Sequence, residues 1–174
     1  MPDEQYSFMR RSVRASEPSV ASSAFVSEQA YLVGDVTIGA QSSVWPFVCL
    51  RGDGGSTTVG EETNIQEFTM LHGATIGDGV TVGHNAVVDY AEIADECLIG
   101  MQSAVLGSAV VEPNCIVAAG SIILHGQTVP EGHMAYGVPA ETKPLTDGQF
   151  EEIRRPREHY VDLAKSYKLS ESLE

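Results

Sequence analysis

Two histidines and one aspartate, His72, His84 and Asp89, have the residue types of a divalent-metal site. Imidazole nitrogens and carboxylate oxygens are common ligands of zinc, and two histidines with one carboxylate also suit ferrous iron. A metal ion held by three protein ligands keeps an open position for water and lowers the pKa of that water to about 7. Whether the three side chains can meet depends on the elements that carry them.

A six-residue repeat runs through most of the chain. A large aliphatic residue recurs at every sixth position, apart from one insertion after Leu50 and two later slips by one residue. The series is Val20, Val26, Leu32, Ile38, Val44, Leu50, Val59, Ile65, Leu71, Ile76, Val82, Val88, Ile93, Ile99, Val105, Val111, Val117, Ile123 and Val129.

A small residue often follows four positions after the aliphatic one. These residues are Ala24, Ala30, Ser42, Ala86, Cys97, Ser103, Ala109, Cys115 and Ser121. Each repeat forms one short strand and a bend, and three sides close a triangular coil, so that the aliphatic residues stack in columns inside a prism. The sequence therefore predicts an all-β protein, a parallel β-helix of about six coils.

The repeat frame places the candidate ligands relative to one another. His72 and Asp89 follow the third-side aliphatic residues of successive coils, so their Cα atoms should lie about 5 Å apart. Arg51 has the same position one coil earlier. His84 lies on the preceding side, up to roughly 16 Å from Asp89, whereas metal–ligand bonds measure about 2 Å. We therefore expect His84 to come from a neighbouring prism, in a contact that closes into a homotrimer.

The repeat divides the chain into a β-helix and flanking segments. Thr146 and Gln149 have the spacing of a helix capping box, and apolar residues at helical spacing follow them. Pro156 should kink or split this helix, whose apolar face should pack on the prism. We predict an N-terminal segment (1–18), the β-helix domain (19–134), an exit loop (135–145) and a C-terminal helix (146–169).

Composition limits the possible partners. The chain has 24 acidic and 10 basic residues and a formal net charge of −14, which disfavours binding to nucleic acid or to anionic membranes. Acid excess with few lysines suggests a halophilic, high-salt cytoplasm. The cysteines lack the spacing of a zinc site or a disulfide framework, and we expect those at the small-residue positions to be inert core residues.

Several short motifs follow one another along the repeat: Ser43-Val44-Trp45-Pro46, Leu50-Arg51-Gly52-Asp53, Asn64-Ile65-Gln66, Leu71-His72 and Val82-Gly83-His84-Asn85-Ala86. This ordered set resembles the γ-class carbonic anhydrase family over residues 20–168. The resemblance implies a left-handed winding, a homotrimer, and reversible hydration of carbon dioxide to bicarbonate at metal sites between subunits.

In that family three histidines bind zinc, iron or cobalt, two from one subunit and one from its neighbour. By this resemblance, His72 is the first ligand and His84 is the second, donated across the interface. Asp89 stands in the position of the third histidine. We take Zn²⁺ as the cofactor, with Fe²⁺ or Co²⁺ as alternatives. Because an aspartate neutralises part of the metal charge, we expect activity to be weak or lost.

The resemblance gives four further residues a role in catalysis. Gln66 matches the residue that orients the metal-bound water, and Arg51 and Asp53 match a pair at the subunit interface and the rim of the site. Tyr160 resembles a helix tyrosine that reaches toward the site. Two other functions stay open: an acyl-CoA-dependent acyltransferase with a histidine general base, and a non-catalytic trimeric scaffold.

Overall fold

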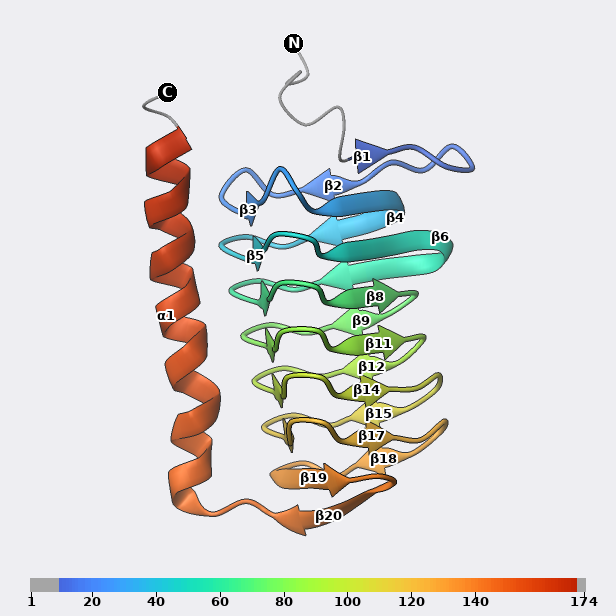
Figure 1. Ribbon diagram of the computed structural model, residues 1–174, viewed down its shortest axis with the longest axis vertical. Coiled ribbons are helices and arrows are strands. Elements are labelled where there is room, and N and C mark those ends of the chain that lie inside the picture. Colours follow the sequence, from blue (N-terminus) through green and yellow to red (C-terminus); the bar gives the residue numbers. More distant parts are fainter. Residues whose placement is uncertain (1–9, 172–174) are drawn as a thin grey trace.

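The computed structural model describes residues 10–171 and consists of parallel β-coils stacked in one column, with a single helix alongside (Figure 1). The column has about seven coils, one more than the repeat indicated, because strand β19 forms a further coil at the C-terminal end. This confirms the parallel β-helix that the hexapeptide pattern predicted and the left-handed winding that the family resemblance implied.

One face of the prism is an eight-stranded sheet with one short strand from each coil and a final antiparallel strand. In spatial order the strands are β3 (Phe25–Val26), β5 (Ser43–Val44), β7 (Asn64–Ile65), β10 (Thr81–Val82), β13 (Leu98–Ile99), β16 (Ile116–Val117), β19 (His133–Gly137) and β20 (Ala140–Pro144).

The other two faces form one twelve-stranded sheet, because β4 (Tyr31–Ile38) and β6 (Cys49–Val59) run through the corner between them. On one side of this corner lie β1 (Arg10–Arg11), β8 (Met70–His72), β11 (Val87–Asp89), β14 (Ala104–Val105) and β17 (Ile122–Ile123). On the other side lie β2 (Ser19–Val20), β9 (Thr75–Ile76), β12 (Glu92–Ile93), β15 (Val110–Val111) and β18 (Thr128–Val129). The insertion after Leu50 thus lies within β6, an 11-residue strand.

The aliphatic columns predicted from the repeat form the core. Every member of the series from Val26 to Val129 is at most 5 % exposed, and the small residues at the fourth positions are buried as well. Strand pairing stacks each column in register; Val82, for example, pairs with Ile65 on one side and Ile99 on the other. Each fully buried aliphatic side chain contributes about 1.5–3 kcal/mol, so the columns hold the coils in a fixed register.

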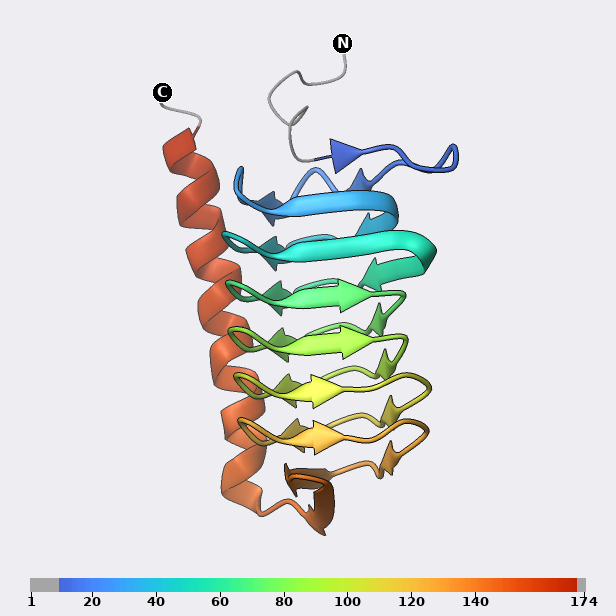
Figure 2. The same cartoon turned by 45° about the vertical axis from the view of Figure 1, so that its right-hand side comes forward.

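The C-terminal helix α1 (Asp147–Glu171) runs back along the column and ends beside the first coils (Figure 2). It begins where the capping pair predicted, since the Thr146 N–H donates to Gln149 Oε1 at 3.0 Å. Pro156 does not divide it. The helix packs on the β3–β10 face through a cluster that includes Trp45 and Ala164. None of the described helices is long and apolar enough to cross a membrane.

The exit loop predicted for residues 135–145 is wrong. This segment forms a hairpin, in which β19 pairs with β16 in parallel and with β20 in antiparallel. Ala135 is fully buried and pairs with Val117, so it continues an aliphatic column with a smaller residue. Part of the predicted N-terminal segment (1–18) lies outside the described residues, and its described portion contains β1, which pairs with β4.

Candidate functional site

The predicted ladder of Arg51, His72 and Asp89 is present on neighbouring strands. His72 pairs in register with Arg51 of β6 and with Asp89 of β11. The His72 ring lies largely buried, and its Nδ1 atom is 2.9 Å from Asp89 Oδ1, a hydrogen-bond distance. The imidazole is therefore held through Nδ1, and Nε2 is the nitrogen left for chemistry.

Two oxygen atoms face His72 Nε2. Asp53 Oδ1 lies 3.5 Å from it, and the Tyr90 hydroxyl oxygen lies 3.4 Å from it. The other carboxylate oxygen of Asp53 accepts a hydrogen bond from Arg51 Nη2 at 3.0 Å. This hydrogen bond with the Arg51 guanidinium lowers the pKa of Asp53 below its ordinary value. Asp53 therefore presents a carboxylate, already oriented by Arg51, to the His72 ring.

Tyr90 is a residue of this cluster that the sequence reasoning missed. Its ring packs edge-on against His72, with 4.7 Å between the ring centroids. It lies over Gly54, Gly55 and Gly73, where an added Cβ atom would meet the tyrosine ring or its hydroxyl. The sequence feature that could have indicated this contact is the presence of these three glycines in the coils next to Tyr90, a large residue at a bend.

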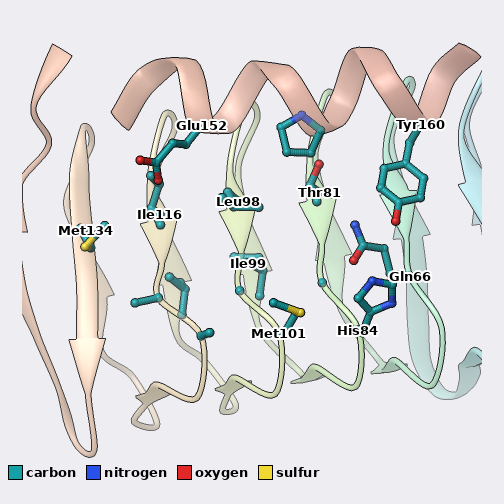
Figure 3. A pocket seen from close by; sticks show the side chains of 16 residues that line it. Gln66, Thr81, His84, Leu98, Ile99, Met101, Ile116, Met134, Glu152 and Tyr160 are labelled. Carbon is teal, nitrogen blue, oxygen red and sulfur yellow. The ribbon is translucent and has the colours of Figure 1, made fainter. Parts of the chain in front are cut away.

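A second group of predicted residues, Gln66, His84 and Tyr160, lines a cavity of about 480 Å³ beneath α1. Tyr160 points its hydroxyl from the helix toward Gln66, and His84 lies next to Gln66 at the end of the cavity (Figure 3). Burial, with a smaller effect of the negative charge of Glu67, raises the pKa of Tyr160. Most of the remaining lining is apolar and includes Leu98.

Polar contacts fix the side chains at this end of the cavity. Thr81 Oγ1 accepts a hydrogen bond from Asn64 Nδ2 at 2.8 Å, and Asn64 Oδ1 accepts one from Gln66 Nε2 at 3.1 Å. This leaves the Gln66 amide oxygen free to accept another. Glu67, which the sequence reasoning also missed, places Oε2 2.7 Å from His84 Nδ1, although this contact is not an aligned hydrogen bond.

The structure thus brings the predicted residues together in two sets and not in one. Arg51, Asp53, His72 and Asp89 form the first edge, whereas Gln66, His84 and Tyr160 form the second edge. Within residues 10–171 of one chain, no three His, Cys, Asp or Glu side chains are grouped closely enough to hold a metal ion.

Comparisons with known proteins agree with this fold. Residues 91–125 match a family model described as the hexapeptide repeat of succinyl-transferase. The chain is 35 % identical to a carbonic anhydrase of Geobacillus kaustophilus, over 89 % of this chain and 88 % of that protein. It is 36 % identical to the mitochondrial γ carbonic anhydrase 2 of Arabidopsis thaliana, over 85 % of this chain. The chain spans 58 % of the length of the Arabidopsis protein.

Among solved structures, a hexapeptide transferase family protein from Anaplasma phagocytophilum has a TM-score of 0.89 and 34 % identity, over 91 % of this chain and 98 % of that one. The coils and their buried columns define a hexapeptide-repeat β-helix protein. The chain belongs to the γ-class carbonic anhydrase family of these proteins.

Proposed function

We propose that the chain is a γ-carbonic anhydrase-like metalloprotein that hydrates carbon dioxide reversibly to bicarbonate at metal sites between the subunits of a homotrimer. The observation that carries the proposal is the division of the functional residues between two edges of one prism. One edge offers His72 with two carboxylates, and the other offers His84 with Gln66. Head-to-tail contact between copies would join one edge to the other three times in a ring.

The residues suit a divalent metal ion. We propose that His72 and one of its neighbouring carboxylates come from one chain and that His84 comes from the next. Asp53 Oδ1 is a buried oxygen without a hydrogen-bond partner among the described residues, which supports binding of a cation at the first edge. When bound, a divalent cation supplies the acidification of water on which hydration of carbon dioxide depends.

The protein's own residues would orient the reactants. The Thr81–Asn64–Gln66 chain of hydrogen bonds fixes the Gln66 amide, so its oxygen can accept a hydrogen bond from the attacking water. The apolar cavity wall beside it suits carbon dioxide, a small molecule without charge, better than it suits bulk water. Tyr160 closes this end of the cavity from the helix, and burial raises the pKa of its phenol.

Subunit complementation tests the proposal. His72→Ala and His84→Ala should each lose bound zinc and carbon dioxide hydration in a stopped-flow assay. Every mixed ring of the two variants holds one junction with both histidines intact. Random co-assembly should therefore restore about a quarter of the wild-type metal content and activity. Wild-type protein without bound metal, or mixtures that recover nothing, would refute an intersubunit site.

Acyl transfer is the second candidate, because a cavity adjoins His84 and the similar Anaplasma structure belongs to a hexapeptide transferase family. Thermal stabilisation by acetyl-CoA and none by zinc would favour it. A protein that loads metal and keeps its fold but gives no hydration would instead favour a trimeric scaffold.

A further inference from the structure

We propose that Asp53 supplies the carboxylate ligand beside His72 and that Asp89 orients the His72 ring without binding the metal. This inference rests on the proposed metal function. It differs from the expectation drawn from the family pattern, in which position 89 holds the third ligand. The argument follows from which ring nitrogen each carboxylate faces.

The distances separate the two carboxylates. Two ligand atoms of one tetrahedral zinc, with bonds of 2.0–2.2 Å, lie about 3.4 Å apart. His72 Nε2 and Asp53 Oδ1 lie 3.5 Å apart, which is too long for a good hydrogen bond and close to that spacing. His72 Nδ1 and Asp89 Oδ1 lie 2.9 Å apart, the ordinary length of an N–H···O hydrogen bond.

Hydrogen bonding separates them again. Arg51 binds one oxygen of Asp53, and the other oxygen, Oδ1, is buried with no hydrogen-bond partner among the described residues. A buried carboxylate oxygen without a partner is costly, and an ion that binds there would remove this cost. Carboxylates that bind metals are commonly held by a hydrogen bond on their second oxygen, as Arg51 holds Asp53. Asp89 lacks this arrangement, since its contact is with Nδ1 of the imidazole.

A carboxylate oxygen lies close to Nδ1 of each histidine. His72 has Asp89 against Nδ1, and His84 has Glu67 at 2.7 Å from Nδ1. Histidines that bind metals usually direct their second ring nitrogen to a carboxylate or carbonyl, which fixes the tautomer and the ring orientation. Both rings therefore leave Nε2 for the metal. Glu67 Oε2 also lacks an aligned hydrogen bond, but its short approach to His84 Nδ1 accounts for its position.

Tyr90 completes the first edge as a positioning residue. Its ring is seated over Gly54, Gly55 and Gly73 and packs edge-on against His72, with the hydroxyl on the Nε2 side. Asp89 holds the ring at Nδ1 and Tyr90 holds its face, so Nε2 is directed toward Asp53. His72 Nε2 and Asp53 Oδ1 thus face the same position at the first edge, where one metal ion could contact both.

Binding of Co²⁺ and Zn²⁺ to the metal-free full-length protein tests the assignment without any activity assay. Asp53→Asn should weaken the affinity for both ions more than 100-fold and change the visible spectrum of Co²⁺. Asp89→Asn should keep one ion per chain and the wild-type Co²⁺ spectrum, with affinity lowered about 10- to 100-fold. Glu92→Gln, which removes one exposed charge on β12, should bind as the wild type does.

Cysteine substitution provides a second measurement that survives partial loss of stability or assembly. A cysteine that replaces a ligand should add an intense thiolate-to-cobalt absorption band, because the thiolate binds the ion directly. The band should appear with Asp53→Cys and be absent with Asp89→Cys. The reverse pattern, or full Co²⁺ affinity in Asp53→Asn, would overturn the assignment and leave the metal function standing. Wild-type protein that binds neither ion would overturn both.

Discussion

A series of three glycine substitutions can measure how tightly Tyr90 is seated against the first edge. At Gly73, where φ is +57°, an added Cβ atom would lie 2.5 and 2.6 Å from two ring atoms of Tyr90. Gly126 has a similar φ of +69° but no atom within 4 Å of the added Cβ. Gly148, in the first turn of α1, has neither a left-handed φ nor an atom within 4 Å of the added Cβ. The series therefore separates backbone strain from steric clash.

The expected effects follow from these differences. A side chain in the left-handed region costs about 1–2 kcal/mol, and the loss of chain entropy in the unfolded state returns about 0.4–1 kcal/mol. Gly126→Ala should therefore destabilise by about 1 kcal/mol. Gly73→Ala should cost about 1–2 kcal/mol more, because the Tyr90 ring must leave its contact with His72. Gly148→Ala should be neutral or stabilise by up to about 1 kcal/mol, because alanine favours the helix.

Urea denaturation followed by circular dichroism measures the three values. The double variant Gly73→Ala/Tyr90→Ala checks the cause, because without the ring the cost of Gly73→Ala should fall to that of Gly126→Ala. Equal costs for Gly73→Ala and Gly126→Ala in the wild-type background would refute the tight seating of Tyr90.

Three further predictions concern the rest of the molecule. Arg157 links α1 to Glu62 and Glu96. In urea denaturation, Arg157→Ala should lower the free energy of unfolding by about 1 kcal/mol, and by less at high salt. The control Arg154→Ala, which removes one exposed ion pair, should have almost no effect. Burial raises the pKa of Tyr160 in the folded protein. The neutral phenol therefore contributes stability that is complete below pH 10 and is lost as pH rises through the folded-state pKa. Tyr160→Phe should reduce the loss of stability at alkaline pH, and an unchanged alkaline loss would contradict this. Iodoacetamide should modify partly exposed Cys49 before Cys97 and Cys115, which are fully buried. Mass spectrometry of the treated native protein measures the order, and equal reaction of all three cysteines would contradict the core packing.

The spacing of residues predicted the coils and the ladder because each depends only on the period. Aliphatic residues at every sixth position are buried together when the coils stack in register, and this register places His72 beside Asp89. The period could not predict the β19–β20 hairpin, because Ala135 fills its column without the large side chain that marks the earlier repeats.

The period also says nothing about side-chain rotation. Whether Asp89 faces Nδ1 or Nε2 of His72 depends on the rotamers of both side chains, and the answer changes the expected role of the aspartate. Tyr90 escaped notice for a related reason, since a large residue at a bend normally extends into solvent. Only the glycines of the neighbouring coils allow its ring to fold back onto the site.

The hairpin at the C-terminal end limits growth of the stack. In a parallel β-helix each coil is a template for the next, so an uncovered last strand could recruit the first strand of another molecule. Here β20 turns back antiparallel on β19 and presents exposed charged residues, Glu141 and Lys143. A fold that could in principle extend into a fibre is thereby ended on this face by a strand of opposite direction.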